Sequence, residues 1–145
     1  MNTLTRKLAT AGSTLALAAS GLLFASSPAS AATSCYAASC QGLDPSTTIC
    51  QNDATTVRDS YYPGVELRYS ATCRAAWARY SAGATFGFTV TVERVHANGS
   101  QTAFYPVHYS GDGATVWTRM INDAGLLARA CGRVASDNWG CTAAY

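Results

Sequence analysis

Two histidines and eight acidic residues are the side chains of this sequence that could support hydrolysis. A serine nucleophile needs a histidine base and a carboxylate gathered around a strained turn, and no G-x-S-x-G or comparable turn surrounds any serine. We expect His96, beside a turn, and His108, near a strand end, to be solvated surface groups. The acids stand mostly at turns and caps, where acids are common, so they indicate no glycosidase-like pair. The sequence predicts no catalytic residues, no cofactor and no enzyme activity.

A second kind of chemistry is recognition by charged side chains. An acid and three arginines fall within one short stretch, where a predicted strand is followed directly by a predicted helix. One interpretation is a partly buried network of arginines and a carboxylate that fixes the helix on the sheet. The other is a surface that binds a ligand or partner. These residues are Glu66, Arg68, Arg74 and Arg79.

Aromatic residues offer a second candidate surface. Trp77 falls on the apolar face of the predicted helix and is expected in the core, and Trp139, beside Cys141, is expected to pack on a disulfide. Trp117 and the pair Tyr61 and Tyr62 remain as candidates for an exposed platform on which a sugar or a partner could stack.

The cysteines predict covalent cross-links. All six follow a predicted export signal, and six is an even number. A metal site would call for C-x-x-C spacing or nearby histidines, which the sequence lacks, so we expect disulfides and no metal. Sequence alone permits many pairings. We expect Cys131 to pair with Cys141 and Cys40 with Cys50, each around a turn, and Cys35 with Cys73 by elimination.

The first 31 residues have the features of a secretory signal peptide. Arg6 and Lys7 precede an apolar run softened by small residues, and Ala29-Ser30-Ala31 is a small-x-small cleavage signal. A membrane anchor and a lipid anchor on Cys35 are the alternatives, and both fit the pattern less well. We expect residues 32–145 to form a single secreted domain. That part of the chain is formally neutral, which argues against nucleic-acid binding.

Strands are the main elements that would position these side chains. Alternating apolar and polar residues between Pro-Gly and Asn-Gly turns predict strands, and residues 32–51 are expected to form a loop tied by disulfides. An Ala-rich stretch at residues 72–80 predicts a short helix. The whole pattern predicts a mainly β fold, a small antiparallel barrel or sandwich of about six strands with one short helix, stapled by disulfides. The expected strands span residues 54–61, 65–70, 83–95, 102–109, 115–121 and 126–134.

Four clusters between residues 40 and 79 carry a family resemblance. They are Cys40-x-Gly42-x-Asp44-Pro45, Cys50-x-x-Asp53-Ala54-x-Thr56-Val57, Val65-Glu66-Leu67-Arg68-Tyr69-Ser70 and Cys73-Arg74-Ala75-Ala76-Trp77-Ala78-Arg79. In these clusters the chain resembles the actinobacterial secreted family called domain of unknown function 2690. The resemblance implies a secreted or extracytoplasmic module and brings no known catalytic residues.

Small size, cysteine content and the lack of a catalytic set favour a non-enzymatic extracellular binding or adaptor module. A cell-wall or polysaccharide-binding protein that uses Trp117, Tyr61 and Tyr62 is one alternative. A secreted protease inhibitor is another, with residues 39–49 as its exposed, disulfide-braced loop. The expected partners are an extracellular protein or a cell-wall glycan, with no nucleic acid and no membrane once the signal is removed.

Overall fold

The computed structural model describes residues 31–81, 87–109, 113–135 and 137–145. The predicted signal peptide, apart from its last residue, lies outside the described residues, as does the start of the strand expected at 83–95. Among the described residues, no helix has the length and apolar character needed to cross a membrane.

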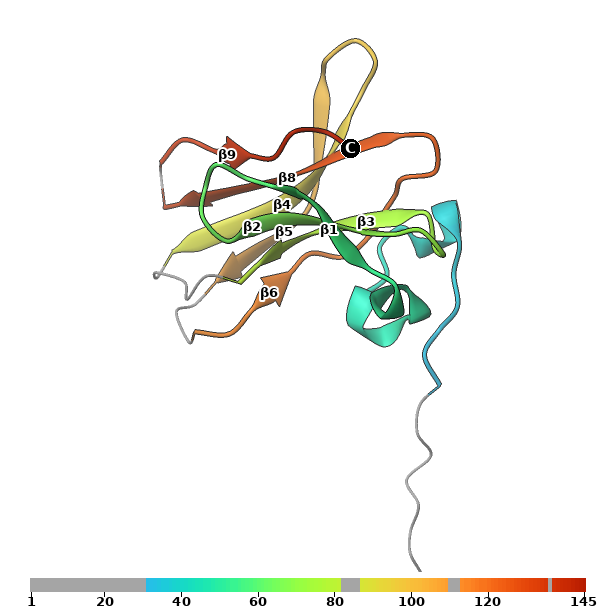
Figure 1. Ribbon diagram of the computed structural model, residues 1–145. Helices are drawn as coiled ribbons and strands as arrows, with labels where there is room; N and C mark the ends of the chain where they lie inside the picture. Colours follow the sequence, from blue (N-terminus) through green and yellow to red (C-terminus); the bar gives the residue numbers. More distant parts are fainter. Residues whose placement is uncertain (1–30, 82–86, 110–112, 136) are drawn as a thin grey trace, which may run out of the picture. The chain divides into compact units, whose positions relative to one another are not determined.

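Two antiparallel sheets form the fold (Figure 1). The first has the strand order β1-β2-β3-β6, with β7 also paired to β3, and the second has the order β5-β4-β8-β9. This confirms the predicted mainly β fold in its sandwich-like form. The first sheet contains β1 (Thr55–Asp59), β2 (Val65–Ser70), β3 (Ala75–Tyr80), β6 (Val116–Trp117) and β7 (Ile121–Asn122), and the second contains β4 (Phe88–Val95), β5 (Gln101–Tyr109), β8 (Leu127–Val134) and β9 (Gly140–Cys141).

Most expected strands are present within a few residues of their predicted bounds. The expected strand at 115–121 is instead divided into the two short strands β6 and β7. Strand β6 pairs with the end of β3 and strand β7 pairs with its start. Strand β9 was not predicted. The only regular helical turns among the described residues are of the 3-10 type.

The helix predicted at residues 72–80 is wrong. This stretch forms a tight turn, in which Arg74 has a positive φ of 51°, and then strand β3. Strand β3 is covered on both faces: Ala76 belongs to the core between the sheets, and Trp77 belongs to a second core on the outer face. With both faces covered, the strand shows no apolar-polar alternation that would distinguish it from a helix.

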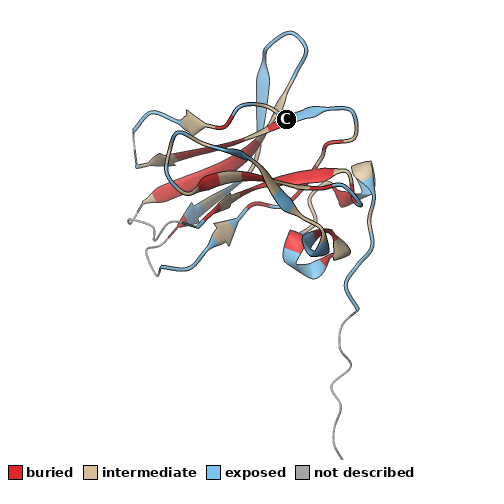
Figure 2. Cartoon of the chain, in the orientation of Figure 1, coloured by how far each residue is buried: buried red, intermediate tan, exposed pale blue. Residues whose placement is uncertain are grey.

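The main core lies between the two sheets, where buried strand segments face each other (Figure 2). The ring of Tyr80 on β3 stacks on the ring of Phe88 on β4, with 3.9 Å between centroids. Gly132 on β8 adjoins this pair: a Cβ there would lie 2.6 Å from Cζ of Phe88 and 2.7 Å from Cγ2 of Val65. The missing side chain at Gly132 therefore provides the space that the Phe88 ring occupies.

Residues 35–53, called the strap below, cover part of the outer face of the first sheet. They contain three 3-10 turns, η1 (Ala37–Cys40), η2 (Pro45–Thr47) and η3 (Ile49–Asn52). Under the strap lies a second, smaller core that confirms the buried position expected for Trp77. Its buried members are Cys40, Cys50, Cys73, Ala75, Trp77 and Met120.

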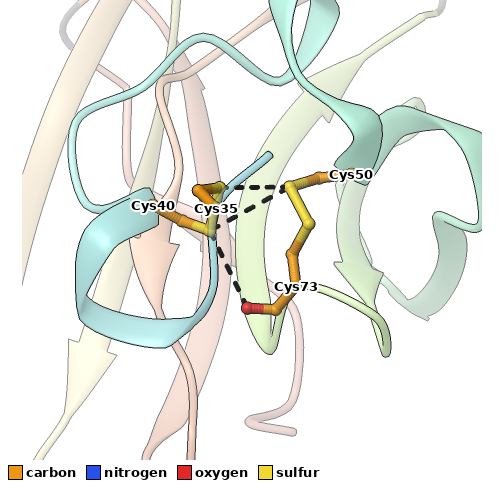
Figure 3. Close-up of side chains that lie close together, drawn as sticks. All are labelled: Cys35, Cys40, Cys50 and Cys73. Atoms are coloured by element: carbon orange, nitrogen blue, oxygen red, sulfur yellow. Dashed lines mark hydrogen bonds between the residues drawn. A yellow bond between two sulfur atoms is a disulfide. The ribbon is translucent and has the colours of Figure 1, made fainter. Parts of the chain in front are cut away.

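Three disulfides join the six cysteines. The pairing of Cys131 with Cys141 is confirmed, and these residues lie directly opposite each other on β8 and β9. The other two predicted pairs are wrong, because the structure joins Cys35 to Cys40 and Cys50 to Cys73. Figure 3 shows the two bridges side by side, with Sγ of Cys35 3.4 Å from Sγ of Cys50. The Cys50–Cys73 bridge fastens the strap to the turn between β2 and β3.

The outer strands of both sheets are short or irregular. Strands β6, β7 and β9 have two residues each. The register of β1 against β2 shifts between Thr56 and Arg58. Strand β5 is irregular at Tyr105, which has a positive φ of 49°, and at the following Pro106, because its register against β4 shifts at this level.

Candidate functional site

Glu66, Arg68 and Arg79 lie together on the outer face of the first sheet, beside the strap. On β2 the first two alternate with residues that point into the main core, and on β3 Arg79 is the register partner of Glu66. Antiparallel neighbours at one register position share a face of the sheet. The structure thus joins three of the four charged residues that the sequence grouped, across strands rather than between a helix and a sheet.

The carboxylate of Glu66 is the centre of a hydrogen-bond network. Its Oε2 accepts from Nη2 of Arg79 and from Oγ1 of Thr56, each at 2.6 Å, and its Oε1 accepts from Oγ of Ser81 at 2.9 Å. Partial burial alone would raise the pKa of Glu66, but these hydrogen bonds and the charge of Arg79 outweigh it and hold the pKa below its ordinary value. Glu66 is therefore ionised over the whole neutral range and engaged within the protein.

Arg68 is held by hydrogen bonds to neutral groups. Its Nη1 donates to Oγ1 of Thr56 at 2.8 Å and its Nη2 donates to the carbonyl oxygen of Ala54 at 2.6 Å. Burial and the neighbouring charge of Arg79 lower the pKa of Arg68, although Glu66 opposes this, and an arginine remains charged at neutral pH. Two guanidinium groups thus lie near one carboxylate, which only Arg79 contacts, and this leaves an excess of positive charge.

These arginines line a pocket of about 250 Å³, called the Arg–Trp pocket below. The strap provides one side of it, and the segment that leads into β6 provides the other. Arg68 and Arg79 are its only charged lining residues among those described. The lining residues are Pro45, Ser46, Gln51, Ala54, Arg68, Trp77, Arg79, Thr115 and Trp117.

Trp117, which the sequence placed on an exposed platform, forms a wall of this pocket and is 38% exposed. Its Nε1 donates to Oδ1 of Asp44 at 3.0 Å, and the same oxygen accepts from the backbone and the hydroxyl of Ser46. Partial burial would raise the pKa of Asp44, but these hydrogen bonds outweigh it and keep the pKa below its usual value. An ionised carboxylate on the strap therefore fixes the orientation of the indole.

Tyr61 and Tyr62 lie elsewhere, in the turn between β1 and β2. Tyr61 is 98% exposed, whereas Tyr62 packs on Phe88 with 5.6 Å between ring centroids. Both line an open recess that also includes Trp139. The guanidinium of Arg133 lies 4.6 Å from the ring centroid of Trp139, and the expected packing of Trp139 on the disulfide stays a prediction. The aromatic residues thus divide between two separate sites.

Sequence reasoning missed the contributions of Asp44, Gln51 and Trp77 to the pocket. Asp44 and Gln51 belong to a segment without periodicity, whose place in space depends on a disulfide. The position of Trp77 beside Arg68 follows from their register pairing. That pairing could have been recognised from the sequence only if residues 75–80 had been predicted as a strand.

Among the described residues, neither histidine is hydrogen-bonded to a carboxylate. His96 pairs with the hydroxyl of Thr102 through Nε2 and His108 with that of Thr89 through Nδ1, each at 2.9 Å. Both pairs join neighbouring strands of the β4–β5 hairpin.

Arg74, the fourth predicted charged residue, lies apart from the pocket and beside a buried carboxyl. Its carbonyl oxygen accepts from the backbone N–H of Asp123 at 3.0 Å. The side chain of Asp123 is buried, and its Oδ1 has no hydrogen-bond partner among the described residues. Burial raises the pKa of Asp123 to about 7, against the opposing charges of Arg94 and Arg74.

This carboxyl makes stability depend on pH. In the unfolded chain Asp123 loses its proton near pH 4, while the folded protein keeps it until about pH 7, so deprotonation favours unfolding in that interval. We expect Asp123 to lower the free energy of unfolding by about 3 kcal/mol as the pH rises from about 4 to about 7. Urea denaturation across this range will measure the slope, and Asp123→Asn should flatten it. An Asp123→Asn protein that keeps the parental slope would contradict the assignment.

Comparison with known proteins identifies a family. A family model described as "Protein of unknown function (DUF2690)" matches residues 38–131, which is more than half of the chain. The matched range includes every residue of the Arg–Trp pocket and leaves Cys35 and Cys141 outside it. No curated protein and no solved structure shows a significant match.

Proposed function

We propose, from the premise that the chain belongs to the DUF2690 family of proteins of unknown function, that it is a non-enzymatic extracellular binding module. Three disulfides are typical of a small domain in an oxidising, extracytoplasmic compartment. The observation that carries the proposal is the Arg–Trp pocket, in which two arginines, of which only Arg79 is paired with a carboxylate, lie beside a fixed, partly exposed indole. Desolvated arginine and tryptophan side chains are the residue types that most often dominate binding energy.

The pocket's role is tested by comparing two equally exposed tryptophans. We would immobilise the secreted, disulfide-bonded protein, pass culture fluid and wall extract over it, wash with salt, and identify what is retained. Trp117→Ala should lose the retained component almost completely, because it removes a wall of the pocket. Trp139→Ala is the matched control, since Trp139 is 42% exposed and Trp117 is 38% exposed.

The outcomes of this experiment separate the candidate sites. Retention by the parent and the Trp139→Ala protein, with loss in the Trp117→Ala protein, supports the Arg–Trp pocket as the binding site. Equal retention by all three proteins, or no retention by the parent from either source, would overturn it. Cooperative thermal unfolding of both variants at close to the parental midpoint shows that a loss of retention does not come from unfolding.

Polysaccharide binding at the open recess is a second candidate function. The observation in its favour is the almost complete exposure of Tyr61 beside the partly exposed Trp139, because exposed aromatic surface of this kind suits stacking on a partner. Retention on insoluble wall glycan that is lost in Tyr61→Ala and Trp139→Ala, but kept in Trp117→Ala, would favour this site.

A protease-inhibitor function receives less support. An extended segment is the usual shape in which a peptide is recognised along its backbone. Residues 39–49 instead contain the 3-10 turn η2, the end of η1 and the start of η3, and Pro45 and Thr48 are buried. Inhibition of a secreted protease by the intact protein would reverse this preference.

A further inference from the structure

We propose that the Arg–Trp pocket binds an acidic sugar, meaning a pyranose ring that carries a carboxylate. This rests on the proposed binding function and names the chemical class of its ligand.

The first argument is charge. The pocket is lined by two arginines and, among the described residues, by no acid. Glu66, the carboxylate in contact with Arg79, already accepts hydrogen bonds from three side chains and has a side chain only 14% exposed. A ligand carboxylate would therefore meet positive charge that the protein itself does not neutralise.

The second argument is the unfilled hydrogen-bonding capacity of Arg79. Its side chain is 33% exposed, and its bond to Glu66 is the only hydrogen bond that its guanidinium makes among the described residues. A planar guanidinium can hold a carboxylate through two parallel N–H donors, and the N–H groups of Arg79 that do not bond Glu66 remain for a ligand oxygen.

The third argument is the character of the wall opposite the charge. The indole N–H of Trp117 is occupied by Asp44, so this side chain offers a ligand only its apolar surface. Such a surface suits the C–H groups of a sugar ring, whereas inorganic phosphate has no apolar part to place against it.

The fourth argument concerns size and neutral polar groups. A pocket of about 250 Å³ suits one ring rather than an extended chain. Gln51 is oriented by donation from its Nε2 to the carbonyl oxygen of Ser46 at 2.9 Å, which leaves its amide oxygen as an acceptor. With the hydroxyls of Ser46 and Thr115 on the lining, the pocket can pair with ring hydroxyl groups.

The test is a titration of the secreted, disulfide-bonded protein by calorimetry and by tryptophan fluorescence. The probes are glucuronate, glucose, acetate, phosphate and a short acidic peptide. We expect glucuronate to bind with a Kd of about 1 mM, which is ordinary for so small a ligand, and each other probe to bind at least about tenfold more weakly.

Three variants locate the site. Trp117→Ala and Arg79→Lys should each weaken glucuronate binding by about tenfold, the second because lysine keeps the charge beside Glu66 but loses the planar fork. Arg58→Gln is the control for general electrostatics, because Arg58 is an exposed arginine of β1 outside the pocket, and it should bind as the parent does. Thermal unfolding of each variant shows that it is folded.

The named outcomes decide the proposal. Glucose binding as tightly as glucuronate, phosphate or peptide binding more tightly, or equal loss in Arg58→Gln, would overturn it. Absence of glucuronate binding also overturns the acidic-sugar proposal. The broader proposed function survives that result if Trp117→Ala still abolishes retention of the captured component. If Trp117→Ala leaves retention unchanged, the broader proposed function fails as well.

Discussion

Replacing both Cys50 and Cys73 by alanine should lower the free energy of unfolding by about 3 kcal/mol, the largest effect we expect from removing one bridge. This disulfide spans 23 residues and fastens the strap to the turn between β2 and β3. Its removal raises the conformational entropy of the unfolded chain, and it also weakens the packing around Cys50 and Cys73, which are both fully buried. Urea denaturation of the oxidised proteins will measure the change.

The neighbouring bridge provides the control. Cys35 and Cys40 are only five residues apart, so the chain-entropy contribution of their bridge is smaller, about 2 kcal/mol. Paired substitution is essential, because a single change would leave a thiol close to the neighbouring disulfide, where exchange can occur. A greater loss from removing the Cys35–Cys40 bridge would show that the strap is not anchored mainly through Cys73.

Substituting Gly132 by alanine should destabilise the protein by about 3 kcal/mol, because the new methyl group overlaps the buried ring of Phe88 and the side chain of Val65. Buried aromatic packing between two sheets cannot move aside without disturbing the stacked Tyr80 as well. Thermal and urea denaturation will measure the loss.

Two further variants separate overpacking from the general effect of replacing glycine. Gly99→Ala meets no atom within 4 Å and carries only the strain of a positive φ of 80°, so it should cost about 1 kcal/mol. Combining Gly132→Ala with Phe88→Leu should recover part of the loss, because the smaller side chain frees space. A double variant that shows the two losses simply added would contradict the proposed clash.

Strand β2, which has one partly solvated face, was predictable from the sequence, and strand β3, which has two covered faces lined by alanines, was not. In β2 the alternation of Val65 and Leu67 with Glu66 and Arg68 indicates a strand directly. In β3 alanines lie on both faces, and their high intrinsic helix propensity was overridden by pairing with β2. The small side chains suit a strand enclosed between the main core and the strap.

The disulfides and the pocket were predictable only in part for a related reason. Cys131 and Cys141 pair across adjacent strands, and a turn between them was visible in the sequence. Cys73 instead meets Cys50 because the β2–β3 turn comes beneath the strap, which is a tertiary relation that chain spacing does not encode. The grouping of Glu66, Arg68 and Arg79 was recognised, but the strap residues that complete the pocket depend on this same relation.

The irregular outer strands have a consequence for how the protein behaves at high concentration. An exposed, regular edge strand is a template on which another chain can add by backbone hydrogen bonding, the first step of edge-to-edge aggregation. Here β6, β7 and β9 are too short to serve as such a template, and β1 is bulged. Strand β5 carries a register shift, and its Pro106 lacks a backbone N–H. Among the described residues, neither sheet therefore offers a long, regular edge for lateral growth by backbone pairing.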